Sequence, residues 1–470
     1  MVPAKQYASP PLTGRWATFG FVVLTLSILW PRYGYMKIGG SPAFSLFTLA
    51  VLLFLVTAAP LQTRSGAIPR ALGRAAQAAP LLVASFASWL AWRYFADAFS
   101  AVPVRAAVST ARSDIYLTSL FLVGLVVGLR RGGLRGTLIV LTYALLVAEI
   151  LGLVERIARM NVLLVLGIDF SAGTGAGKWH LITDPKWRGG SFRAQSIFNH
   201  PIVFCQYIVC AVPAALMVLQ TSTSRRHRTV ALAALILALP MIWATGSRAG
   251  FPALLIALTI YGIFYLRARM KPGVSASLTT VILILGALLA ALAGFGVAQV
   301  LASGSNAQET GSTSARVYMF ETARIALERS PLWGFGDGSA LGIAGINEVG
   351  GVGTIDSLPV SITLDFGYFG LALFTVLFIT AVTHFISTAI RNSRRGQGME
   401  GLAIAAGLAG LMVIFLVLSI PDNISLVYYF IGLGCGAISL EPMRKARDAR
   451  RPSPYAPTAR DAAADQRFNA

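Results

Sequence analysis

The sequence predicts an all-α, polytopic membrane protein with about 12 transmembrane helices. Hydrophobic residues make up 56% of the 470 residues and charged residues only 12%, whereas a soluble globular protein carries about 25% charged residues. The mean hydropathy is +0.69. The apolar residues also gather in runs long enough to cross the hydrocarbon core, which takes about 20 helical residues. These observations exclude an ordinary soluble protein.

Each apolar run is expected to form one transmembrane helix. The run at 80–96 differs from the others because it contains Arg93, and the run at 359–390 is long enough to tilt or to extend beyond the membrane. The runs centre on residues 16–30, 42–60, 80–96, 113–129, 136–154, 197–220, 229–245, 250–266, 277–302, 359–390, 401–420 and 423–440.

Basic residues predict the orientation because they are concentrated in every second connection between these runs. Lys and Arg favour the cytoplasmic side, so both termini are predicted to be cytoplasmic. Residues 1–15 then form a cytoplasmic N-terminus, 16–440 the transmembrane domain and 441–470 a basic, disordered cytoplasmic tail. The long polar connections at about 155–196 and 303–358 face the periplasm, and the periplasmic part is expected to be partly helical.

The distribution of charge also indicates which partners to expect. There are 39 Lys and Arg residues against 19 Asp and Glu. This excess is divided into small clusters beside apolar runs, which is typical of a protein that meets anionic lipids at the inner leaflet. We therefore expect membrane lipids as partners and no binding of nucleic acid.

Two polar segments on the predicted outer side contain candidate binding residues. The segment SFRAQSIFNHP includes Arg193 and His200, and ATGSRAG places Arg248 in a tight turn. One guanidinium group can bind two phosphate oxygens at once through its fork of N–H donors. Arginines that come together on the outer side would therefore form a site for an anionic group. The alternatives are that each arginine is an interface anchor and that His200 only caps the helix that follows it.

Two further outer segments carry a third arginine and three carboxylates. The stretch SARVYMFETARIALERSPLWGFGDG opens with Arg316 and ends in a Gly-rich turn around Asp337. TIDSLPVSITLDFGYFG has Asp356 at a membrane entry and Asp365 inside the apolar run. Burial of a carboxyl group in the membrane is costly, which makes Asp365 a candidate functional residue. No cluster of His, Cys and carboxylate residues has metal-ligand spacing, so we expect no metal and no other cofactor.

Taken together, these segments resemble the O-antigen ligase and polysaccharide polymerase superfamily of bacterial integral-membrane glycosyltransferases. The resemblance runs from about Arg193, which precedes Phe-Asn-His-Pro, to Gly370. It includes the Gly-Ser-Arg-Ala-Gly turn around Arg248 and the helix that Arg316 opens and PLWGFG closes. The last family signature, His-Asn with a downstream Gly-x-x-Gly, keeps its spacing here with Asp356 in place of the usual His.

The resemblance implies a metal-independent glycosyltransferase of the bacterial inner membrane that acts at the periplasmic face. Its donor would be an undecaprenyl-diphosphate-linked glycan and its acceptor a sugar or lipid-linked sugar, in surface polysaccharide or exopolysaccharide biosynthesis. Arg248 and Arg316 would stabilise charge on the leaving diphosphate, and Asp356 would take the proton of the acceptor hydroxyl. The implied substrate-binding residues are Arg193, His200, Asp337 and Asp365.

Two functions from other classes stay open at this point. A transporter of an anionic solute would use the same outer arginines as a recognition vestibule, although the cytoplasmic connections are short and uniformly basic. A non-catalytic subunit of a polysaccharide export system is the other alternative, because Asp356 replaces the usual His. Polysaccharide export proteins are candidate partners of this protein.

Overall fold

The computed structural model describes residues 13–30, 34–37, 45–188, 190–269, 307–347, 353–355, 357–393, 399–417 and 421–440. This part of the chain is almost entirely helical, as the sequence predicts. Strands occur in it only as two-residue pairs: β1 (Trp187–Arg188) pairs antiparallel with β2 (Ser191–Phe192), and β3 (Ile346–Asn347) with β4 (Gly353–Thr354). The all-α fold class is therefore confirmed.

The described part of the chain is a succession of helices. In chain order they are α1 (Thr13–Leu29), α2 (Leu46–Ser65), α3 (Ala67–Ala78), α4 (Pro80–Ala98), α5 (Pro103–Gly128), α6 (Gly133–Ala158), α7 (Val162–Val165), α8 (Ser171–Thr174), α9 (Ala176–Thr183), α10 (Pro201–Thr221), α11 (Arg225–Ala244), α12 (Gly250–Arg269), α14 (Ala307–Leu327), α15 (Ala340–Ala344), α16 (Leu358–Ser393), α17 (Met399–Val417), the 3-10 helix η2 (Pro421–Asn423) and α18 (Ile424–Ile438).

Most predicted spans appear as helices of the expected length. Among the described residues, seven helices are long and apolar enough to cross a membrane: α5, α6, α10, α11, α12, α16 and α17. The run at 80–96 belongs to α4, which is bent by 115° against α3, and α1, α2 and α18 are shorter apolar helices. The run at 277–302 lies outside the described residues. The fold is thus a polytopic helical membrane protein, and the number of about 12 spans stays a prediction.

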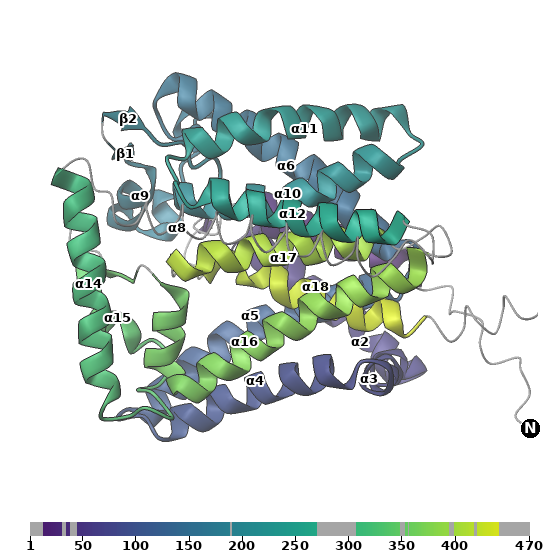
Figure 1. The fold of residues 1–470 in the computed structure, drawn as a ribbon, viewed down its shortest axis with the longest axis horizontal. Coiled ribbons are helices and arrows are strands. Elements are labelled where there is room, and N and C mark those ends of the chain that lie inside the picture. The colour runs from purple at the N-terminus through teal and green to yellow at the C-terminus, as the bar shows by residue number, and fades with distance from the viewer. Residues whose placement is uncertain are drawn as a thin grey trace, which may run out of the picture.

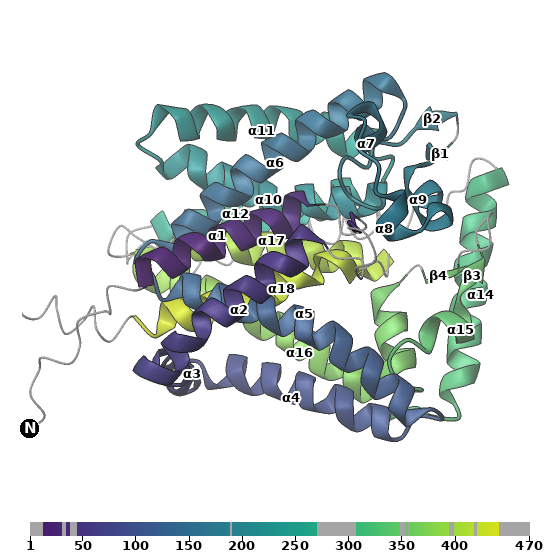
Figure 2. The same cartoon turned by 180° about the vertical axis from the view of Figure 1, so that it is seen from behind.

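The long helices lie side by side, and the long polar connections gather at one end of them (Figure 1). At that end, on the left of Figure 1, lie α7 to α9 with β1 and β2, and α14 with α15. The opposite end holds α3 and the turn from α10 to α11, and the reverse view in Figure 2 shows the same separation. We call the end with the long connections the outer end, and its location in the periplasm stays a prediction.

Closely packed glycines join the C-terminal helix to the middle of the bundle. α5 and α18 have the most extensive contact of any helix pair in the described part. A Cβ on Gly124 would collide with the carbonyl oxygen of Tyr429, and one on Gly432 with that of Phe121. Small residues of this kind let two backbones approach within a membrane, where dispersion rather than the hydrophobic effect holds helices together.

Candidate functional site

Arg193 lies against the turn that contains Arg248. The segment before α10 is attached to the end of α11 by a backbone hydrogen bond from Ala194 to Ala244 of 2.9 Å. The Arg193 Nε donates to the Thr245 carbonyl oxygen at 2.8 Å. Arg248, which is half-buried, follows three residues later in the turn between α11 and α12. The structure therefore brings together the segments that carry these two predicted arginines, at the outer end of the bundle.

The remaining two predicted catalytic residues fall where side chains are not described. Arg316 lies within α14, which contacts α15 and α16 at the outer end. Asp356 itself lies outside the described residues, directly before Ser357, which is buried and precedes α16. The Ser357 carbonyl oxygen accepts the backbone N–H of Ser361 at 3.0 Å, as a helix-capping residue does. The catalytic roles of Arg316 and Asp356 stay predictions.

His200 caps α10. Its Nδ1 accepts the backbone N–H of Ile202 at 3.2 Å. Burial, together with the positive charges of Arg193 and Lys186, lowers the pKa of His200 from 6.5 to about 3. The imidazole is therefore neutral at physiological pH and its Nδ1 is already an acceptor, which favours the capping role over acid–base chemistry.

A buried carboxylate on α6 holds the segment of Arg193 and His200 in place. Glu155, only 1% exposed, accepts the backbone N–H groups of both Gln195 and Ser196. Ser196 has a left-handed backbone (φ 54°) that is uncommon for a residue other than glycine, and its hydroxyl donates to Ala148 at 2.7 Å. Sequence reasoning missed Glu155 because it stands at the boundary between a predicted span and a predicted loop.

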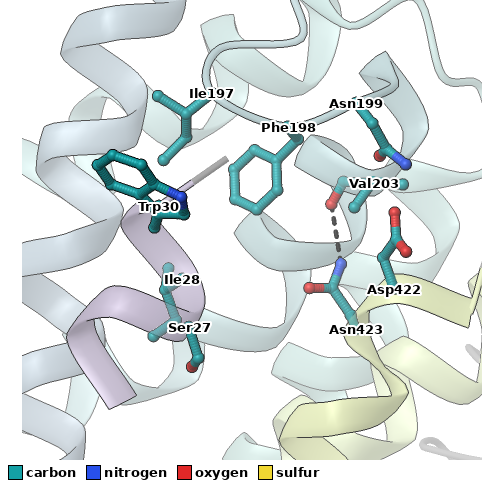
Figure 3. Close-up of a pocket in the computed structure, with 9 residues that line it drawn as sticks. All are labelled: Ser27, Ile28, Trp30, Ile197, Phe198, Asn199, Val203, Asp422 and Asn423. Atoms are coloured by element: carbon teal, nitrogen blue, oxygen red, sulfur yellow. Dashed lines mark hydrogen bonds between the residues drawn. The ribbon is translucent and has the colours of Figure 1, made fainter. Parts of the chain in front are cut away.

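A small pocket opens beside this segment at the outer end (Figure 3). It is bordered by the aromatic rings of Trp30 and Phe198 and by the polar side chains of Asn199, Asp422 and Asn423. The Asn423 Nδ2 donates to the Val203 carbonyl oxygen at 3.0 Å and so fixes η2 on α10. The buried Oδ1 of Asn199 has no hydrogen-bond partner among the described residues. Asn199 directly precedes His200, so this pocket adjoins the segment that carries Arg193 and His200.

α16 is broken at Gly367. That glycine has φ 73° and ψ 178° inside the helix, a combination that only glycine adopts readily. The freed carbonyl oxygens of Leu364 and Asp365 accept the N–H groups of Phe335 and Gly336, each at 2.8 Å. The Phe366 carbonyl oxygen accepts the indole N–H of Trp92 at 2.9 Å. This irregular backbone is tolerated because other parts of the protein supply its hydrogen bonds.

Asp365 and Asp337 lie together around the Gly-rich turn that braces this break. The Asp365 Oδ1 accepts the N–H of Ala340 at 2.8 Å, at the start of α15. An Asp337 carboxylate oxygen accepts the Ser109 hydroxyl, and the other lies 3.5 Å from Arg93. Both predicted binding residues thus have structural partners at the Gly-rich turn, while Arg193 lies against the separate turn that contains Arg248. Their predicted binding role has not been tested.

These features define a class of protein: a polytopic helical membrane protein with a basic site and a broken helix at the end where its long connections gather. No group of three His, Cys, Asp or Glu side chains within the described ranges is arranged to hold a metal ion. Residues 208–375 match the family model described as O-Antigen ligase. This match supports the resemblance to the O-antigen ligase superfamily that the motifs indicate.

The family match runs from α10 into α16. It contains Arg248, Arg316 and Asp356, whereas Arg193 and His200 precede it. A comparison with curated proteins gives no match. The family supports a glycosyltransferase-type enzyme of polysaccharide biosynthesis, and together with the apolar helices it identifies a multi-pass protein of the bacterial inner membrane.

Proposed function

We propose that this protein transfers or polymerises an undecaprenyl-diphosphate-linked glycan at the periplasmic face, without a metal ion. The observation that carries the proposal is the attachment of Arg193 to the turn of Arg248 at the outer end, within and beside the matched region. Two guanidinium groups in one region suit a diphosphate, because each presents a fork of N–H donors to phosphate oxygens.

In the proposed reaction the acceptor hydroxyl oxygen attacks the anomeric carbon of the donor glycan. The bond from that carbon to the diphosphate oxygen breaks, and undecaprenyl diphosphate leaves with the electron pair. Arg193, Arg248 and Arg316 stabilise the charge that develops on the leaving group. Asp356 accepts the proton of the acceptor hydroxyl as the general base. The acceptor is a sugar, free or lipid-linked.

An apolar groove supports a lipid-linked donor. It opens between the start of α16, the part of α16 after the break and the end of α17, with a volume of about 230 Å³. Its lining includes Leu358, Phe374 and Phe415. Leu358 is the second residue after Asp356. The apolar lining of this groove suits part of an isoprenoid chain near the residue that we propose as the base.

The experiment compares arginine variants of purified protein in proteoliposomes. The substrate is lipid-diphosphate-linked glycan extracted from the producing strain, and the readout is release of undecaprenyl diphosphate. Loss of one donor to a developing anion costs about 10²–10³-fold in turnover, so R248A and R193A should fall by about that factor. R248K should recover little, because an ammonium group lacks the bidentate fork.

The matched control is R225A, because Arg225 is exposed at the opposite end of α11 from the Arg248 turn. It should turn over like the wild-type protein. Wild-type turnover in both R248A and R193A would refute the diphosphate site. For the base, D356N should lower turnover by about 10²–10⁴-fold. Near-normal turnover of D356N would show that Asp356 only orients the acceptor.

A further inference from the structure

We infer that Arg93 is a positioning residue for this site. Through a buried ionic network at the outer end, it holds in place the part of α16 before the break, which directly follows Asp356 and Ser357. The inference rests on the proposed function for its catalytic consequence. Arg93 is 4% exposed in α4, within an apolar helix where burial of a charge is costly and marks a functional candidate.

The first step of the argument is that Arg93 joins three elements. Its guanidinium group forms an ion pair with Asp114 of α5 and lies 3.5 Å from Asp337 of the Gly-rich turn. It also donates to the Ser113 hydroxyl at 2.8 Å. The backbone N–H of Asp337 donates to Asp97, which is also on α4, at 2.9 Å. The turn is therefore attached to α4 and α5 through both its side chain and its backbone.

The second step is that the same guanidinium group reaches the break itself. Its carbon atom lies 5.3 Å from the centre of the Phe366 ring, the last residue before Gly367. On the other side it lies 5.7 Å from the Trp89 ring. Trp92, the residue directly before Arg93, donates its indole N–H to the Phe366 carbonyl oxygen. One helix, α4, thus holds the side chain and the backbone of Phe366.

The third step is that the turn fixes the angle of the break. Backbone N–H groups of the turn bind two of the three carbonyl oxygens freed at Gly367. The approach is close, because a Cβ on Gly334 would lie 2.6 Å from the Gly367 nitrogen. A shift of the turn cannot occur without a shift of residues 358–366, the part of α16 before the break.

The consequence for catalysis follows from the length of that part. Residues 358–366 form a lever of roughly 13 Å at 1.5 Å per helical residue, so a rotation of about 10° at the break moves the start of α16 by about 2 Å. A misplacement of about 1 Å in a reacting group can cost about 10²-fold in rate. Lys cannot replace Arg93, because an ammonium group is a compact charge that lacks the planar fork needed to bridge Asp114 and Asp337 and to stack on Phe366.

The experiment measures kcat, donor KM and hydrogen exchange for R93K and D337N in the purified full-length protein. The matched control is R112K. Arg112 is an exposed arginine of α5, so this variant carries the same Arg-to-Lys substitution outside the network. We expect R93K to lower kcat by at least about 10-fold with donor KM within about twofold of the wild type. We also expect faster exchange in residues 358–366 and unchanged exchange in the turn of Arg248.

Two results would overturn the inference. One is wild-type kcat and wild-type exchange in R93K and D337N. The other is loss of folded protein in both variants while the folded fraction keeps the wild-type kcat, which would make the network a stabilising one only. If R93K fails to insert, D337N decides, because it keeps the size of the side chain and removes only the charge that faces Arg93. A wild-type protein without turnover refutes the proposed function instead, while hydrogen exchange still tests whether Arg93 holds the break.

Discussion

Removal of the Glu155 carboxylate should release the segment that carries Arg193. In E155A, the buried N–H groups of Gln195 and Ser196 lose their common acceptor. An unsatisfied buried donor costs about 1–3 kcal/mol, so the two together should weaken the attachment by about 2–6 kcal/mol. E155Q keeps an acceptor oxygen at this position, so its cost should be smaller.

Hydrogen exchange of a peptide that covers residues 190–200 measures this cost locally. A weakening of 2 kcal/mol corresponds to about 30-fold faster exchange, because about 1.4 kcal/mol is a factor of ten in an equilibrium constant. Turnover should fall as well, because Arg193 then loses its fixed place against the Thr245 carbonyl oxygen.

The matched control for Glu155 is on the same helix. Glu149 is also fully buried in α6, but neither of its carboxylate oxygens has a hydrogen-bond partner among the described residues. E149Q keeps the size of the side chain and removes no hydrogen bond among the described residues, so stability should be little changed. Unchanged exchange of residues 190–200 in E155A, or an equal effect of E149Q and E155Q, would refute the reasoning.

Three further predictions concern the break, the capping histidine and the orientation. G367A should disrupt the folded outer end, because the backbone conformation alone costs about 1–3 kcal/mol in a residue other than glycine and the new Cβ would collide with the Leu332 carbonyl oxygen; G342A, in open space, should retain the wild-type melting temperature and turnover. Because the pKa of His200 is lowered to about 3, the unfolded chain binds more protons than the folded chain below pH 6.5, and wild-type stability should fall as the pH decreases from 6.5. The stability of H200N, in which Asn can still cap α10, should fall less. Equal pH dependence of the two melting temperatures would contradict this. Reporter fusions should be periplasmic at residues 170 and 340 and cytoplasmic at 227 and 395, and one inverted result within either pair would overturn the orientation.

The arrangement of the arginines shows which part of the site could be predicted from the sequence. Arg193 and Arg248 were expected on one face from their places in outer segments, and the structure attaches their segments to each other. The family resemblance groups Asp337 and Asp365 with them, and Asp365 is also costly to bury inside an apolar run. Their contacts instead involve Ser109, Arg93 and the start of α15, and no pattern in the sequence connects residues so far apart.

The sequence by itself determined the membrane class, the helical architecture and the resemblance to the O-antigen ligase family. These depend on the transfer of each apolar run out of water and on the need of every backbone group for a partner inside that run, both of which are local properties. Only the tertiary structure decided that Glu155 binds the strained Ser196 and that α16 breaks at Gly367. Only it showed Arg93 between the carboxylates of Asp114 and Asp337 and against Phe366. Such buried polar contacts join separate helices, and their partners are chosen by packing, because each charge taken out of water must meet whichever group the fold brings within reach.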